Sequence, residues 1–130
     1  PMLQAAKPKK IFIMAGTNDI FHLSIDEYAI RYENLLNAIQ DSIPTAKIYL
    51  QSILPMNQDM KAGSPSDEKI RQANKKVTEI ANKRHLQFIN IYSLYVKDGK
   101  LPEEITTDGI HLHPENYDRW AKAIEKFINE

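Results

Sequence analysis

Near the C-terminus, the segment TTDGIHLHP (residues 106–114) places an acid three residues before a histidine. An imidazole acts as a general base when a neighbouring group fixes its tautomer. Asp108 is able to accept a hydrogen bond from one ring nitrogen of His111 across the turn that Gly109 makes flexible. The other ring nitrogen then faces a nucleophile. The spacing therefore predicts two of the three members of a hydrolytic triad.

A second polar cluster, Gly16-Thr17-Asn18-Asp19, follows a short apolar run. The side-chain amide of Asn18 donates hydrogen bonds and would stabilise an oxyanion from the end of a strand. We expect Asp19 to hold the loop by bonding to nearby backbone N–H groups. Asp and Asn in loops are usually turn formers, so either cluster alone is weak evidence. The two clusters together, at one end of one sheet, are much stronger evidence for a site.

The remaining candidate groups favour structural roles. His113 and His111 would form a metal pair, but no third Cys, His or acid ligand accompanies them, so no metal and no cofactor is predicted. We expect His113 to line the entrance of the site or to cap the following helix. Trp120 and Tyr117 follow helical spacing and are assigned to the core.

The segments that must position these clusters alternate between two patterns. Short apolar runs bounded by turn formers are typical of buried strands, whereas longer segments with apolar residues three and four apart are typical of helices. This alternation predicts an α/β domain with a parallel sheet covered on both faces, with both clusters at the carboxyl ends of the strands. The expected strands are 10–15, 47–54 and 87–91, and the expected helices are 26–42, 67–84 and 114–129.

Composition excludes several classes of protein. The chain has 130 residues, a length typical of one domain, with 17 basic and 17 acidic residues. Zero net charge argues against nucleic acid or an anionic membrane as the main partner. The chain contains no cysteine, and no apolar run approaches the ~18 residues that a membrane span needs. The compartment is not determined, because removal of a leader before residue 1 is compatible with a periplasmic or secreted protein.

The two clusters make the chain resemble the SGNH, or GDSL, hydrolase superfamily. Residues 16–19 match its Gly-X-Asn-Asp block, and residues 108–111 match its Asp-X-X-His block. The resemblance implies a three-layer, flavodoxin-like α/β/α fold that hydrolyses esters, often acetyl esters of sugars or lipids. It also implies that Asn18 is an oxyanion-hole donor, with Gly16 and Asp19 in the supporting loop. Asp108 and His111 would complete a Ser-His-Asp triad.

Two blocks of that family are absent. No serine of the chain stands in the Gly-Asp-Ser block that carries the nucleophile, and the block with the oxyanion-hole glycine is missing as well. The resemblance therefore implies that residues 1–130 are the C-terminal portion of one hydrolase domain, without its first two strands. In the family's strand order, 2-1-3-4-5, this leaves the edge of the strand at 10–15 open. We expect the missing N-terminal segment or a second copy of the chain to cover that edge.

Two functions remain open at this point. In the first, the parent protein is a serine esterase acting on a small ester, and this chain alone is inactive. In the second, the chain is a catalytically inactive remnant that binds carbohydrate or a partner through the same cleft. A Gly-Asp-Ser segment encoded upstream would distinguish them. A nucleotide- or flavin-binding domain is disfavoured because no glycine-rich phosphate loop precedes a helix.

Overall fold

The computed structural model describes residues 9–130, and it confirms the predicted α/β class. Three parallel strands lie side by side in the order of the sequence, with Lys10 opposite Lys47 and Tyr49 opposite Gln87. Each strand begins where the apolar run begins but ends two or three residues before the run does. The last residues of each run therefore belong to the loops that follow the strands. The strands are β1 (Lys10–Ile13), β2 (Lys47–Gln51) and β3 (Gln87–Ile89).

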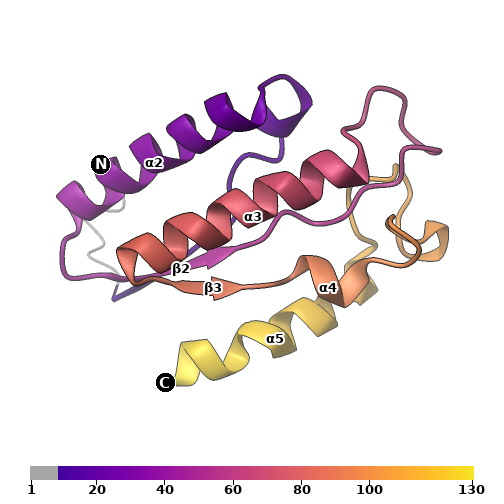
Figure 1. Ribbon diagram of the computed structural model, residues 1–130. Helices are drawn as coiled ribbons and strands as arrows, with labels where there is room; N and C mark the ends of the chain where they lie inside the picture. The colour runs from indigo at the N-terminus through magenta and orange to yellow at the C-terminus, as the bar shows by residue number, and fades with distance from the viewer. Residues whose placement is uncertain (1–8) are drawn as a thin grey trace.

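The helices form the two outer layers (Figure 1). Two long helices, α2 and α3, lie on one face of the sheet, and α5 lies on the other, as expected for a three-layer fold. The predicted helix at 114–129 is divided, because its first turn is a 3-10 turn that starts at Pro114. The helices are α2 (Ile25–Ser42), α3 (Asp67–Arg84), α4 (Tyr92–Tyr95) and α5 (Tyr117–Asn129), with 3-10 turns η1 (Asp19–Phe21), η2 (Glu103–Ile105) and η3 (Pro114–Asn116).

The starts of the two long helices follow from serine caps. The Ser24 hydroxyl accepts a hydrogen bond from the backbone N–H of Glu27 at 3.1 Å, and the Glu27 carboxylate accepts from the N–H of Ser24 at 3.2 Å. This reciprocal pair satisfies two backbone donors that would otherwise lack partners. Ser66 caps α3 in the same way, through the N–H of Lys69 at 3.0 Å.

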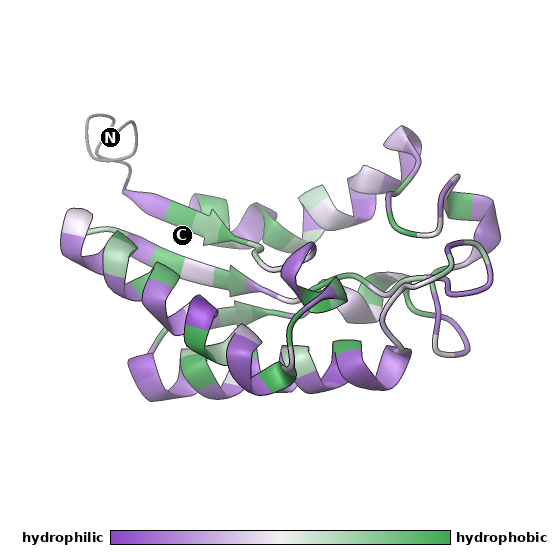
Figure 2. Ribbon diagram, turned by 90° about the horizontal axis from the view of Figure 1, so that it is seen from above, coloured by the Kyte–Doolittle hydropathy of each residue, from purple (hydrophilic) through white to green (hydrophobic). Residues whose placement is uncertain are grey.

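The core has two parts, one on each face of the sheet. The strands are mostly apolar, whereas the helices alternate apolar and polar residues (Figure 2). Burial of apolar surface on both faces is what keeps a parallel sheet folded. Between the sheet and helices α2 and α3 lie Tyr28, Leu36, Leu50, Ile70 and Val77, and on the α5 face lie Tyr49, Ile91, Tyr95 and Leu101.

The outer edge of β1 is open within residues 9–130, because β1 pairs only with β2. Three of its four residues are half-buried, and only Ile13 is fully buried. No helix in the described part of the chain is long and apolar enough to cross a membrane.

Candidate active site

Asp108 and His111 are in direct contact in the loop that precedes α5. The carboxylate Oδ2 of Asp108 lies 2.6 Å from Nδ1 of His111. The other carboxylate oxygen, Oδ1, accepts from the backbone N–H groups of Ile110 at 2.9 Å and His111 at 2.8 Å. The carboxylate therefore holds both the histidine ring and the backbone that carries it.

These bonds determine the charge and the tautomer of the pair. Hydrogen bonds from the backbone and the ring of His111, with the N–H of Ile110, hold the pKa of Asp108 well below its ordinary value. An ionised carboxylate only accepts hydrogen bonds, so in the neutral ring the proton is on Nδ1. Within residues 9–130 the Nε2 atom of His111 has no hydrogen-bond partner, so it is left as the acceptor that a general base requires.

Thr106 holds the Asp108–His111 loop through two hydrogen bonds, a role that the sequence did not indicate. Its hydroxyl donates to the backbone carbonyl of His111 at 2.6 Å and accepts from the N–H of Gly109 at 3.0 Å. The residue is 3% exposed. The only available signal was its position, two residues before Asp108, and such a threonine is far more often an ordinary turn residue.

Gly109 docks the loop against the segment that follows β2. Its carbonyl accepts from the backbone N–H of Asn57 at 2.8 Å, and its φ is +82°. A Cβ at this position would lie 2.8 Å from the carbonyl oxygen of Asn57 and 3.0 Å from Cβ of Met60. Glycine is therefore required here for close approach as well as for its positive φ.

Gly16 positions the other cluster, after β1. Its φ is +92°, and a Cβ there would lie 2.2 Å from the ring of Tyr28. The Tyr28 hydroxyl donates to the carbonyl of Ala15 at 3.0 Å, so the buried ring supports the turn directly. Asn18, at the start of η1, is exposed, and within residues 9–130 its side chain makes no hydrogen bond. Its amide is thus free to bind another group.

The bonding expected of Asp19 differs in the structure. The carboxylate lies 3.7 Å from the guanidinium of Arg31 on α2, and within the described residues it accepts no backbone hydrogen bond. The loop is instead closed by main-chain bonds, from Ile20 to the carbonyl of Gly16 at 2.9 Å and from Phe21 to that of Asn18 at 3.2 Å. Asp19 therefore links the loop to α2.

One cavity of about 320 Å³ connects the two clusters. Asn18 from the β1 loop and His111 from the loop before α5 both line it, as expected if the carboxyl ends of the strands carry the site. Asp108 lies behind His111 and is not part of the wall. The other lining residues are Met14, Thr17, Ile53, Leu54, Met56, Ile110, Tyr117 and Trp120.

The assignment of Trp120 and Tyr117 to the core was wrong in part. Tyr117 is 43% exposed, and both rings contribute to the cavity wall, stacked with centroids 5.8 Å apart. Helical spacing indicated that they share one face of α5, but not that the first turn of this face lines the cavity. His113 precedes η3, where its side chain makes no cap; its Nε2 lies 2.9 Å from the hydroxyl of Thr107.

No serine lines this cavity. Ser52, which we placed inside a strand, follows the end of β2; its buried hydroxyl accepts from the N–H of Tyr92 at 2.7 Å. Ser24 and Ser66 are occupied as helix caps. The cavity wall therefore carries an imidazole and a side-chain amide, but no serine hydroxyl.

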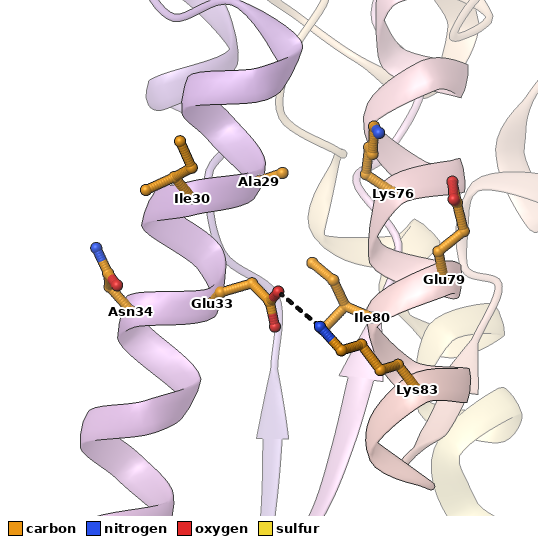
Figure 3. Close-up of a pocket in the computed structure, with 8 residues that line it drawn as sticks. All are labelled: Ala29, Ile30, Glu33, Asn34, Lys76, Glu79, Ile80 and Lys83. Carbon is orange, nitrogen blue, oxygen red and sulfur yellow. Dashed lines mark ion pairs between the residues drawn. The ribbon is translucent and has the colours of Figure 1, made fainter.

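A second concavity, of about 350 Å³, lies between α2 and α3 (Figure 3). Charged side chains surround it, and Glu33 pairs with Lys83 across it at 3.9 Å. None of the residues predicted for the site lines it. Across residues 9–130, no group of three or more His, Cys, Asp or Glu side chains is arranged to hold a metal ion.

Comparison with known proteins identifies the family. A model of the GDSL-like lipase/acylhydrolase family matches residues 1–119. The chain belongs to this family. A search of curated proteins gave no match.

Solved structures share the fold over part of their length. A proposed platelet activating factor from Streptococcus pneumonia is 30% identical with a TM-score of 0.82; 92% of this chain covers 59% of that one. A GDSL-like lipase from Bacteroides thetaiotaomicron is 24% identical (TM-score 0.76; coverage 94% and 62%). A lipase/acylhydrolase from Enterococcus faecalis is 19% identical (TM-score 0.78; coverage 95% and 63%). This chain thus spans about three fifths of these proteins.

Proposed function

We propose that the protein containing this chain is an ester hydrolase that works by Ser-His-Asp acyl transfer. His111 is the general base, Asp108 orients it, and Asn18 is an oxyanion donor, with Gly16 and Asp19 supporting the Asn18 loop. The observation that carries the proposal is the single cavity lined by both His111 and Asn18, with Asp108 2.6 Å behind the imidazole. Family membership supports ester hydrolysis as the reaction class.

In the proposed chemistry, His111 acts first as a base and then as an acid in each half-reaction. The serine oxygen bonds to the ester carbonyl carbon while Nε2 of His111 takes the hydroxyl proton, and the carbonyl electron pair moves onto oxygen. The Asn18 amide donates to that oxyanion. Collapse breaks the bond to the alcohol, which leaves with the proton from His111. Water then attacks the acyl-enzyme by the same route and releases the carboxylic acid.

The serine belongs, in this proposal, to a segment that precedes residue 1 in the same hydrolase domain. Two observations support a covering segment beside β1. The outer edge of β1 is unpaired within residues 9–130, and the His111 side chain is 76% exposed. Unpaired strand edges favour pairing with another strand, from the N-terminal segment or from a second copy.

Denaturing mass spectrometry of the natively purified protein tests this part directly. A longer polypeptide, or a second co-purifying one, that carries Gly-Asp-Ser is the expected result. A stable, monodisperse monomer of these 130 residues alone would contradict the covering segment. It would leave the second function, an inactive cleft that binds carbohydrate or a partner.

Hydrolysis of p-nitrophenyl acetate tests the assigned roles in the protein that includes the nucleophile segment. We expect His111→Ala to lower kcat by about 10⁴-fold or more, as loss of a triad base does. His113→Ala is the matched control, because it removes an imidazole two residues away that contacts Thr107 instead of Asp108. Comparable rates for the two variants would refute the assignment.

A further inference from the structure

The cavity beside Asn18 and His111 has mainly apolar walls. Met14 follows β1, Leu54 and Met56 follow β2, and Ile110 belongs to the Asp108 loop. No Lys, Arg, Asp or Glu side chain is among the lining residues. Hydroxyls or charges buried against such walls would lose hydrogen bonds to water without replacement, whereas an alkyl group gains from leaving water.

Trp120 is held rigidly in this wall by a residue of the sheet. Its indole Nε1 donates to the side-chain oxygen of Gln51 at 2.7 Å, and Gln51, at the end of β2, is 7% exposed. A buried amide that kept no partner would be costly, so this bond fixes the orientation of the indole. The stacked ring of Tyr117 restricts it further.

The positions of the reacting groups indicate which half of an ester enters the cavity. His111 must hand its proton to the departing alcohol, so the alcohol leaves next to the imidazole. An acyl group on the opposite side of the carbonyl carbon would extend between the apolar walls.

We infer that the substrate carries an acyl chain longer than acetyl and that Trp120, fixed by Gln51, sets the length this cavity accepts. The inference rests on the proposed function and adds the substrate class to it. At about 320 Å³ the cavity is at the small end of sites that bind small molecules. This size favours short and medium chains over the long chains of membrane lipids.

A series of p-nitrophenyl esters, from acetate through butyrate and hexanoate to dodecanoate, measures the length directly in the protein that includes the nucleophile segment. Because each buried methylene adds transition-state binding, kcat/KM is expected to rise about three- to fourfold per methylene until the cavity is full, and then to fall. A second series of acetates with lengthening alkyl alcohols is expected to show no such rise.

Two variants test whether Trp120 sets the longest acyl chain that the cavity accepts. Trp120→Leu removes part of the wall and should move the optimum to longer chains. Gln51→Leu keeps similar volume but removes the bond to the indole, and should broaden the optimum. Phe127→Leu is the matched control, because Phe127 packs on the same face of the sheet without lining the cavity. It should lower Tm without moving the optimum.

The outcomes separate this inference from the proposed function. No turnover of any ester, acetate included, would overturn the proposed function itself. Turnover of acetate with a flat or falling acyl series would overturn the inference and leave esterase activity intact. A rise only in the alcohol series would place the cavity on the other half of the ester. An optimum that neither Trp120→Leu nor Gln51→Leu moves would remove Trp120 from the role.

Discussion

The two ends of the sheet use polar groups in opposite ways. At the amino end, Nζ of Lys10 donates to the carbonyls of Phe127, Ile128 and Glu130 at 2.6, 3.0 and 2.7 Å, which joins β1 to the last turn of α5. The Glu130 carboxylate accepts from Lys47 at 2.6 Å and from the Tyr49 hydroxyl at 2.8 Å. The charged groups at this end therefore use their hydrogen-bonding capacity on partners within the same cluster.

At the carboxyl end, the polar groups are only partly satisfied. Nδ1 of His111 is bonded to Asp108, but within residues 9–130 Nε2 has no partner, and neither has the Asn18 amide. Both side chains line one cavity. The comparison teaches that the number of charged groups does not distinguish a site from a structural cluster. What distinguishes it is hydrogen-bonding capacity left free and directed to one space.

Among these variants, Asp108→Asn should cause the largest loss of activity. The amide oxygen is still able to accept from the N–H groups of Ile110 and His111, so the loop should keep its shape. The amide nitrogen would face Nδ1 and move the ring proton to Nε2, which leaves no base. We expect kcat to fall by about 10⁴-fold, as a wrong tautomer does in a related triad.

Steady-state kinetics of the Asp108→Asn variant measure the loss of kcat, and its Tm checks that the loop keeps its shape. Thr107→Val, in the same loop, is the control, since its hydroxyl contacts His113 instead of the pair. Because the pKa of Asp108 is held low, any acid limb in the wild-type pH–rate profile belongs to another group. Equal rates for Asp108→Asn and Thr107→Val would contradict the role of Asp108.

Asn18→Ala is expected to have the next largest effect. It removes a donor whose only proposed partner is the oxyanion, so kcat should fall by about 10²- to 10³-fold while KM changes little. Tm should stay close to that of the wild type, because the side chain makes no hydrogen bond in the described chain. A loss of stability as large as the loss of activity would assign Asn18 to the fold.

Gly109→Ala tests how tightly the loop is docked, and Gly63→Ala is its matched control. Both glycines have φ near +80°, but a Cβ at Gly63 meets nothing within 4 Å. Positive φ costs each alanine about 1–2 kcal/mol of unfolding free energy. At Gly109 the contact with Asn57 should add about 1–3 kcal/mol. Equal losses in chemical denaturation would mean that the contact relaxes freely.

The sequence predicted the layers because their patterns are local. Serine caps and helical spacing place α2 and α3 within one residue, and the apolar runs identify all three strands. The strand ends were predicted too late, since Ile53 and Leu54 stay apolar for the cavity and the core after β2 has ended. The roles of Thr106 and Trp120 were not predicted, because they depend on hydrogen-bond partners that only the folded chain brings near.

The smallest effect is expected from a substitution at the amino end of the sheet, where it should change only Tm. Hydrogen bonds from Lys47 and Tyr49 lower the pKa of Glu130, so its contribution to stability is present above the unfolded pKa, about 4.3, and is lost as the pH falls through the folded value. Glu130→Gln should therefore lower Tm slightly at pH 7 and not at acid pH. Because the groups are exposed, 1 M salt should abolish the difference. Glu125→Gln is the control, because Glu125 is an exposed residue of α5 with no ion pair in the described chain. Ester hydrolysis should be unchanged in both variants, and an altered rate would show that the two ends of the sheet are coupled.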